Sequence, residues 1–341
     1  MQNAEKKVIA QVKELSVNFA GKHILITGAN GLIGSSLVDI LMLANDYLEN
    51  KITVFALGRE RERLEKRFAS YLYFDELRIV EGDVTSIAFS EDFALDYIIH
   101  AASPAHPLAF STTPVEVMKA NLVGTIHMLD LAMENRAKIL FVSSGEIYGI
   151  SDEAEKCFSE NDSGYVDILS PRSCYPESKR AAETLCASYH AQYGVDCVIA
   201  RLCHVFGASI TERNSRADAQ FLRNALHGED IVMKSPGTQV RSYCYVKDAV
   251  CGLLFLLAKG KGGEAYNVAN KNSVASIREY AQTLAEISGV SIVNGFPTEQ
   301  ESSGYSVVSR AVLNAEKLER LGWRAAYGLK EGLEETYEYG R

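Results

Sequence analysis

The chain has 341 residues, 47% of them hydrophobic and 23% charged, a composition that is ordinary for a globular protein with a sizeable core. Its formal net charge of -9 argues against general affinity for nucleic acid or anionic membranes, because both need a basic surface. The seven cysteines include no Cys-x-x-Cys pair, and the seven histidines lack ligand spacing. We therefore expect reduced thiols, a cytoplasmic location and no metal site.

Residues 1–20 predict a helical extension. Apolar residues recur there at helical spacing, at Val8, Ile9, Val12 and Leu15. Charged residues lie between them, which does not fit the apolar core of a signal peptide. The apolar run Gly252–Ala258 is too short to span a bilayer, so we expect no membrane segment.

Residues 21–205 alternate short apolar runs with helical stretches. The pattern predicts strands at 23–27, 52–57, 77–80, 97–100, 139–143 and 197–202, and helices at 31–43, 59–71, 115–134 and 175–193. Near-continuous apolar strands that alternate with helices are typical of a parallel sheet covered on both faces. We predict an α/β fold for this region, a Rossmann-type doubly wound parallel sheet.

Beyond residue 205 the alternation loosens, and residues 206–341 are expected to form a smaller α/β lobe that binds the substrate. Helices are predicted at 246–258 and 277–287. The short run Ala265–Val268 is able to return to the main sheet. The boundary between the two parts is therefore expected to be interleaved.

The segment Thr27–Gly34 has the features of a dinucleotide-binding loop, because it follows a predicted strand and opens a predicted helix. Its glycines permit a tight turn and let the backbone approach a pyrophosphate, which then rests on the helix N-terminus. The candidate cofactor-binding residues in this loop are Gly28, Asn30, Gly31, Leu32, Ile33 and Gly34.

The end of the second predicted strand lacks the carboxylate that normally binds the ribose hydroxyls of NAD. Arg59 stands there instead. It either binds the 2′-phosphate of NADP or begins a solvated charged helix, and the sequence leaves both interpretations open. Asp83, after the third strand, either contacts the adenine or caps a turn.

Tyr175 and Lys179 are four residues apart on a predicted helix, so they share one face. An ammonium group there favours the ionised phenol, and a tyrosine tuned in this way can act as a base. The pair follows the glycine loop and also Ser144 and Glu146 in the chain. Together these residues indicate a hydride-transfer enzyme.

From about Lys22 to Trp323 the chain resembles the extended short-chain dehydrogenase/reductase family, the nucleotide-sugar epimerases and dehydratases. The resemblance is most specific in His100–Ala105, Pro171–Arg180 and Gly237–Asp248, where the chain is most similar to UDP-glucuronate decarboxylases. It implies bound NAD, with NADP as the alternative because of Arg59.

The resemblance also implies a catalytic cycle. Tyr175 takes the proton from a sugar 4-hydroxyl, Ser144 hydrogen-bonds the same oxygen, and Lys179 holds the nicotinamide ribose. With a glucuronate, oxidation at C4 makes a β-keto acid, loss of carbon dioxide leaves an enolate, and return of the hydride gives UDP-xylose. Glu146 acts near C5 as an acid/base or orienting carboxylate.

Two sets of binding residues are implied by the same resemblance. Contacts to the cofactor are expected from Asp83, Val84, Ala101, Ala102 and Ser103. Contacts to the nucleotide sugar are expected from Pro104, His204, Arg216, Gln239, Arg241 and Tyr245, with arginine suited to phosphate because its fork binds two oxygens.

The chain departs from the decarboxylase pattern at two positions near the expected chemistry. Gly145 stands between Ser144 and Glu146 where decarboxylases resemble Thr-Ser-Glu, and His204 replaces the usual asparagine. Three other functions therefore stay open: an NDP-sugar 4,6-dehydratase, a UDP-glucuronate 4-epimerase, and a non-catalytic nucleotide-sugar sensor. Retention of the serine, tyrosine and lysine counts against the sensor.

The two long helices predicted at 115–134 and 175–193 carry faces of small and apolar residues. These faces comprise Val117, Ala120, Asn121, Gly124 and Met128 on the first helix, and Ala182, Leu185, Cys186 and Tyr189 on the second. The simplest interpretation is that they all cover the sheet. The resemblance implies instead that the helices pair with their copies across a twofold axis, which predicts a homodimer.

Overall fold

The computed structural model describes residues 2–89, 94–153, 155–209 and 214–341. Its centre is a seven-stranded sheet in which every pair of neighbours is parallel, in the order β11-β7-β5-β4-β1-β2-β3. The strands are β1 His23–Thr27, β2 Thr53–Gly58, β3 Leu77–Glu81, β4 Tyr97–His100, β5 Lys138–Ser144, β7 Cys197–Leu202 and β11 Ala265–Val268. The predicted parallel α/β sheet is confirmed.

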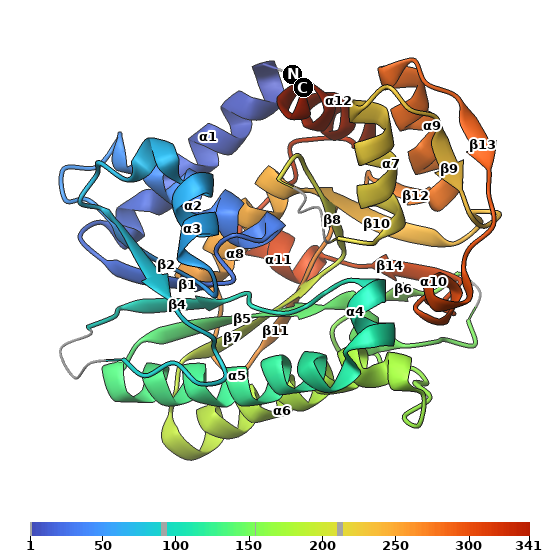
Figure 1. Cartoon of the computed structure of the whole chain (residues 1–341). Coiled ribbons are helices and arrows are strands. Elements are labelled where there is room, and N and C mark those ends of the chain that lie inside the picture. The colour runs from blue at the N-terminus through green and yellow to red at the C-terminus, as the bar shows by residue number, and fades with distance from the viewer. Residues whose placement is uncertain (1, 90–93, 154, 210–213) are drawn as a thin grey trace.

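Helices cover both faces of this sheet, as Figure 1 shows. One face carries the two long helices α5 Pro114–Asn135 and α6 Cys174–Tyr193. The other face carries α2 Leu32–Asn45 and α8 Val246–Lys259, with α1 Gln2–Ser16 packed against both of these helices and α3 Arg61–Arg67 beside β2 and β3.

Alternate residues of each strand supply the two buried layers, because successive side chains of a strand point to opposite faces. Ile24 and Ile26 pack on the side of α2 and α8, whereas Leu25 packs on the side of α5 and α6. Both sides are apolar, so the strands read as continuous apolar runs in the sequence. The N-terminal helix joins the first layer through Val8, Val12 and Leu15, as its pattern predicted.

The rest of the chain builds a smaller α/β part above one end of the sheet (Figure 1). Its five-stranded sheet consists of β12 Val274–Ser276, β10 Val240–Tyr245, β14 Arg310–Leu313 and β6 Cys157–Phe158, with β8 His204–Phe206 paired to β10. A second ladder joins β9 Ile231–Met233 to β13 Ile292–Asn294. The helices here are α7 Ala217–Leu226, α9 Ile277–Ser288, α10 Glu299–Ser303, α11 Glu316–Arg320 and α12 Leu329–Gly340.

Two segments beyond residue 205 lie with the main sheet. β11 pairs with β7, as expected for Ala265–Val268, and α8 packs on β5 and β7. The chain thus crosses between the two parts more than once.

The short elements differ most from the predicted ones. The charged helix predicted at 59–71 is split into α3 and the 3₁₀ turn η2 Ala69–Tyr71, and Arg59 precedes it as part of the turn after β2. The turns η1 Val17–Phe19, η3 Gly145–Tyr148 and η4 Pro171–Ser173, and the helix α4 Pro107–Thr112, were not predicted. No helix in the described parts of the chain is long and apolar enough to cross a membrane.

Candidate active site

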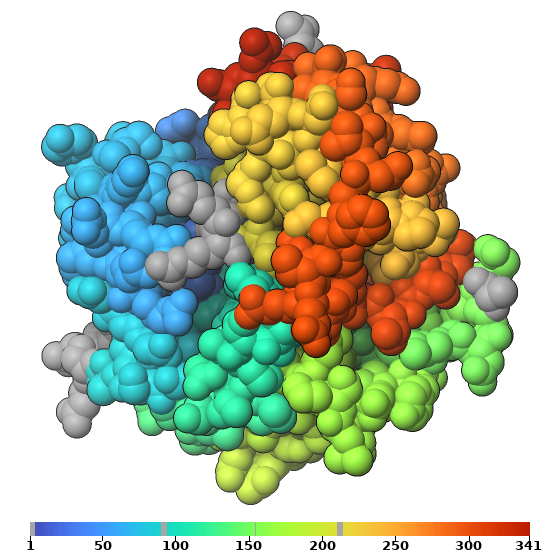
Figure 2. Space-filling model, turned by 45° about the vertical axis from the view of Figure 1, so that its right-hand side comes forward, coloured from blue at the N-terminus to red at the C-terminus, as the bar shows by residue number. Residues whose placement is uncertain are grey.

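A cavity of about 1030 Å³ lies where the carboxyl ends of the parallel strands meet the smaller part. Figure 2 shows the face on which the N-terminal segments, in blue and teal, meet the C-terminal ones, in yellow and orange. Ligands of open parallel sheets bind at such a crevice. Of the residues named from the sequence, the cavity is lined by Gly28, Asn30, Gly31, Leu32, Ile33, Gly34, Arg59, Asp83, Val84, Ala101, Ala102, Ser103, Pro104, Ser144, Glu146, Tyr175, Lys179, His204, Arg216, Gln239 and Arg241.

The glycine loop between β1 and α2 is shaped for close backbone approach. Gly28 has φ +68°, and a Cβ there would lie 2.9 Å from the Cα of Ala102. A Cβ on Gly34 would overlap the carbonyl oxygen of Gly28. Both positions therefore require glycine.

Thr27, the last residue of β1, connects the glycine loop to the turn after β4. Its Oγ1 accepts hydrogen bonds from the backbone N–H groups of Ala101 (3.1 Å) and Ala102 (3.0 Å). The same hydroxyl lies 2.8 Å from Nδ1 of His100, whose pKa is lowered to about 3 by burial and by the charge of Lys179. This neutral, buried network holds the turn after β4 against the glycine loop.

Arg59 and Asp83 lie together at the far end of the cavity. The Asp83 carboxylate accepts hydrogen bonds from the backbone N–H (2.9 Å) and hydroxyl (2.7 Å) of Thr85, so it does cap a turn. Burial opposes ionisation of Asp83, but the bonds from Thr85 and the charge of Arg59 lower its pKa overall. Arg59 is exposed and lines the cavity, which keeps both of its predicted roles open.

Tyr175, in the first turn of α6, is buried and stacks on Phe110 of α4 with ring centroids 4.8 Å apart. Burial and the charge of Glu146 raise the pKa of Tyr175 to about 12, although a hydrogen bond with Ser144 and the charges of two arginines oppose the rise. The phenol is therefore neutral in the ligand-free protein at neutral pH.

The predicted effect of Lys179 on this phenol stays a prediction, because Lys179 is not among the groups that shift the pKa of Tyr175 here. The ammonium nitrogen lies 5.9 Å from the centre of the Tyr175 ring and donates a hydrogen bond to the carbonyl of Val142 (2.8 Å). Burial lowers the pKa of Lys179 to about 7. The helical spacing thus brings the two residues near each other, while burial is the main influence on the pKa of the lysine.

Glu146 has a partner that the sequence did not reveal. Arg172, in the turn η4, forms an ion pair with it, with 2.7 Å between Nη1 and Oε2. The guanidinium of Arg172 also lies 5.1 Å from the centre of the Phe110 ring. Arg172 and Phe110 thus connect the carboxylate to the tyrosine. Arg172 belongs to the Pro171–Arg180 motif, but a motif alone does not show which side chain it faces.

Ser144 also orients the backbone of the turn η3. Ser144 begins this turn, and its hydroxyl accepts a hydrogen bond from the N–H of Glu146 at 3.2 Å. The serine thus holds the backbone of Glu146, and its side chain also hydrogen-bonds that of Tyr175.

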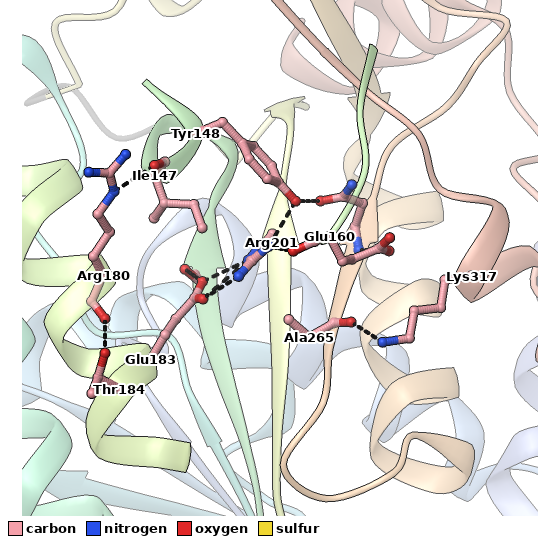
Figure 3. Close-up of polar contacts among 11 residues, drawn as sticks. Ile147, Tyr148, Glu160, Arg180, Glu183, Thr184, Arg201, Ala265 and Lys317 are labelled. Atoms are coloured by element: carbon pink, nitrogen blue, oxygen red, sulfur yellow. Dashed lines mark hydrogen bonds and ion pairs between the residues drawn. The ribbon is translucent and has the colours of Figure 1, made fainter. Parts of the chain in front are cut away.

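A buried polar network supports the turn from below, as Figure 3 shows. Arg201 of β7 binds Glu183 with two nitrogens, Nη2 at 2.7 Å and Nε at 3.1 Å, and donates to the hydroxyl of Tyr148 at 3.0 Å. Arg180 of α6 donates to the carbonyl of Ile147 at 2.7 Å. The C-terminal end of η3 is thereby anchored to the central layers.

Several buried polar atoms in the cavity wall have no hydrogen-bond partner within the described residues. They are Ser103 Oγ, Arg172 Nε, Arg216 Nε, Arg223 Nη1, Gln239 Oε1 and Tyr280 Oη. Unsatisfied buried groups are rare in native proteins, and their concentration here indicates a polar ligand. Arg216 is held in place by the carbonyl of Val205 (2.7 Å) and by Asp218 (2.8 Å).

Tyr245 does not line the cavity, unlike the other residues expected to bind substrate. Its ring is buried against Phe206 and Tyr327, with centroid distances of 5.8 and 4.7 Å. The neighbouring Asp248 is also structural, since it accepts hydrogen bonds from the N–H groups of Ala326 and Tyr327. Both residues connect α8 and β10 to the C-terminal segment.

The helix faces proposed for dimerisation cover the sheet instead. Val117, Asn121, Gly124 and Met128 of α5 are buried, as are Ala182 and Cys186 of α6. The outward face of α5 carries other apolar residues, namely Val115, Met118, Val123 and Met133.

Comparisons with known proteins agree on the family. Residues 24–269 match the model of the NAD dependent epimerase/dehydratase family. The chain belongs to this family. It is 34% identical over 315 residues to UDP-glucuronic acid decarboxylase 6 of Arabidopsis thaliana, covering 91% of this chain and 86% of that protein. It is 33% identical to UDP-glucuronic acid decarboxylase 1 of Danio rerio, covering 93% and 72%.

Solved structures share the fold. A dTDP-glucose 4,6-dehydratase from Streptomyces venezuelae with bound NAD has a TM-score of 0.79 and 25% identity, over 93% of this chain and 96% of that one. A UDP-glucuronic acid 4-epimerase from Bacillus cereus, also with NAD, has a TM-score of 0.79 and 24% identity, over 93% and 98%.

The residues of this family member fit a dinucleotide. A Cβ at Gly28 or Gly34 would fill the space along the glycine loop. The buried hydroxyl of Ser103, also in the cavity wall, has no hydrogen-bond partner within the described residues. No cluster of His, Cys, Asp and Glu side chains that could hold a metal occurs in the described residues.

Proposed function

We propose that this member of the family is a UDP-glucuronate decarboxylase that forms UDP-xylose. The observation that supports this most directly is the convergence of Ser144, Tyr175 and Glu146 on one cavity, with Glu146 positioned by Arg172. Relatives named UDP-glucuronic acid decarboxylases match nearly the whole chain.

The chain's own residues have distinct tasks in this reaction. Tyr175, once ionised, accepts the proton of the 4-hydroxyl, and Ser144 hydrogen-bonds the same oxygen. Bound nicotinamide would supply the hydride acceptor and return the hydride at the end. The new C4 ketone makes the glucuronate a β-keto acid, so the electrons of the C5–C6 bond pass into an enolate as carbon dioxide leaves. Glu146 then delivers or guides the proton to C5.

Ionisation of Tyr175 depends on the charge of the cofactor. An opposite charge close to an acid favours its ionised form. The positive charge of an oxidised nicotinamide would therefore lower the pKa of Tyr175 from its raised value. NAD is the proposed cofactor, and NADP is the alternative supported by Arg59.

The test is to incubate the purified protein with UDP-glucuronate, UDP-glucose and dTDP-glucose and to measure product masses. Decarboxylation removes the mass of carbon dioxide from UDP-glucuronate, dehydration removes the mass of water from a glucose derivative, and epimerisation leaves the mass unchanged. A product of unchanged mass, or a product from the glucose derivatives alone, would contradict the proposal.

A 4,6-dehydratase is the second candidate, because Glu146 is also placed to remove a C5 proton. That reaction also needs an acid for the leaving hydroxyl. Gly145 has no side chain to supply one, and the neighbouring Arg172 is not an acid at neutral pH. The 4-epimerase and the sensor remain outcomes of the same experiment.

We further propose a cytoplasmic homodimer. All seven cysteines are free in the structure, in keeping with a reducing compartment. The outward face of α5, with Val115, Met118, Val123 and Met133, is the surface proposed to pair with its copy.

A further inference from the structure

A small side chamber of about 20 Å³ opens beside Glu146. Roughly 10–15 Å³ is enough for one water molecule, so the chamber has room for one small group. Most of its wall also belongs to the main cavity. The chamber is lined by Gly145, Glu146, Gly149, His204, Arg241, Ser306, Val308 and Ala311. Both residues that depart from the decarboxylase pattern, Gly145 and His204, therefore meet in one place.

Gly145 contributes no side chain to its side of the chamber. A Cβ built on it would lie 2.9 Å from Cδ1 of Leu313, which is buried. A serine at this position would push against that leucine. The chain thus lacks the hydroxyl of the Thr-Ser-Glu pattern and has packed the leucine against the gap.

His204 supplies a neutral donor opposite the glycine. Burial and the charges of Arg241 and Arg216 hold the pKa of His204 well below its usual value, so its ring keeps one N–H at neutral pH. The ring is held edge-on to Tyr243, with centroids 5.9 Å apart. No hydrogen bond to either ring nitrogen is present within the described residues, which leaves the N–H available to a ligand.

Arg241 supplies a buried positive charge. Its guanidinium donates to backbone carbonyls only, at Val308 (2.7 Å), Val240 (2.9 Å) and Ser309 (3.3 Å), and no carboxylate binds it in the part of the chain that the structure describes. By contrast, the cavity cations Arg216 and Lys234 are each paired with an acid.

The charges around the chamber do not balance. Burial lowers the pKa of Arg241, while the nearby charge of Glu146 raises it and that of Arg172 lowers it. Two guanidinium groups therefore lie near one carboxylate, since Glu146 pairs with Arg172 and shares the chamber wall with Arg241. A buried excess charge is costly unless an anion compensates it.

We propose that this chamber binds the C6 carboxylate of the sugar, with His204 and Arg241 as donors that replace the absent hydroxyl at position 145. This inference rests on the proposed function. It moves Arg241 from the diphosphate, where the family resemblance placed it, to the carboxylate. When the C5–C6 bond breaks and its electron pair enters the enolate, carbon dioxide is released in this chamber.

The experiment compares the affinities of UDP-glucuronate, UDP-glucose and UDP by calorimetry with NAD present. In His204→Phe, UDP-glucuronate should bind about tenfold more weakly or worse, as expected for a lost hydrogen bond to a charged group. UDP-glucose and UDP should keep their affinities. Arg241→Lys should show the same selectivity. Gln239→Ala, at the nucleotide end, serves as the control and should weaken all three ligands alike.

An equal loss for all three ligands in the His204 and Arg241 variants would overturn the inference, because these residues would then serve the nucleotide or the fold. His204→Gln keeps an N–H donor and should recover part of the affinity for UDP-glucuronate. Failure of that recovery, with a normal melting temperature, also counts against the inference. If the wild-type protein itself binds UDP-glucuronate no better than UDP-glucose, the proposed substrate is wrong.

Discussion

At the scale of single residues, burial shifts the pKa values of two residues of the site far from their ordinary values. Tyr175 is harder to ionise than a free tyrosine, and Lys179 is easier to deprotonate than a free lysine. Both shifts have the same main cause, which is the loss of water around the charged form. Catalysis therefore depends on the ligands that bring compensating charge.

Removal of the tyrosine hydroxyl tests the catalytic assignment. Tyr175→Phe should abolish turnover while nucleotide binding remains nearly intact, because the ring still stacks on Phe110 and only the proton acceptor is lost. The measurement pairs product formation with calorimetric binding of UDP. Near-normal turnover would rule out Tyr175 as the base.

Arg172 is predicted to position Glu146. Arg172→Gln removes the ion pair and should lower kcat about tenfold or more, in line with the loss of a charge-assisted hydrogen bond. It should also allow reduced nicotinamide to accumulate during turnover, which absorbance can follow, since the steps after oxidation need Glu146. An unchanged kcat with a raised KM would mean that Arg172 contacts only the substrate.

Arg59 decides between the cofactors. Arg59→Ala should weaken NADP binding by about 1.5–3 kcal/mol if the guanidinium binds the 2′-phosphate, and should leave NAD binding unchanged. Fluorescence titration with both nucleotides measures this. Equal NADP affinity in the two proteins would assign Arg59 to the solvated surface.

Lys179 gives a pH dependence with a definite sign. Its pKa in the folded protein, about 7, lies below the ordinary lysine value of 10.5, so between these values the unfolded chain binds more protons than the native state. The stability of the ligand-free protein relative to Lys179→Met should therefore rise with pH in this window, by up to about 1.4 kcal/mol per pH unit. Urea unfolding at pH 7 and pH 9 tests this, and a constant difference would show an unshifted lysine.

At the scale of elements, the catalytic turn η3 depends on its attachment to β7 and α6. Arg201 is the central contact, because it joins Glu183 of α6 to Tyr148 at the end of the turn and to the carbonyl of Glu160. The ends of sheet strands alone would not orient the carboxylate of Glu146. Arg172 holds that carboxylate, and the polar network holds the backbone that follows it.

Breaking this network should destabilise the protein strongly. Arg201→Met leaves Glu183 buried without its cation, a change that costs about 3–5 kcal/mol in the free energy of unfolding. Arg61→Met is the matched control, since the exposed pair of Arg61 with Glu65 contributes about 0–1 kcal/mol. Similar urea midpoints for the two variants would mean that water replaces the lost arginine.

At the scale of the whole molecule, the cavity lies between two parts, and the chain passes from one to the other more than once. β11 and α8 come late in the sequence but complete the main sheet, so the smaller part is attached to it by several crossings. The same layering leaves the outer face of α5 exposed, with apolar side chains at Val115, Met118, Val123 and Met133.

The dimer proposed at this surface gives a prediction of mass. Light scattering at micromolar concentration should give about twice the 37.5 kDa of one chain, as a twofold dimer requires. Met118→Glu combined with Val123→Glu should give the single-chain mass. Tyr73→Glu changes an exposed aromatic residue in the turn before β3 and should leave the dimer intact. A wild-type protein with the single-chain mass would refute the dimer.

The sequence by itself determined the parallel sheet, its main helices and most of the cavity lining. Local patterns suffice there, because buried parallel strands must be apolar throughout and a nucleotide loop must carry glycine at fixed spacing. The candidate Tyr175 came from its spacing to Lys179, whereas the roles of Ser144 and Glu146 came from the family resemblance.

Only the tertiary structure decided which side chains face one another. The pairing of Glu146 with Arg172, the position of Lys179 under Val142, the burial of Tyr245 and the inward faces of α5 and α6 all depend on packing between segments far apart in the chain. Spacing fixes the neighbours of a residue within its own element. Desolvation and long-range contacts, which fix its charge and its partner, exist only once the layers have assembled.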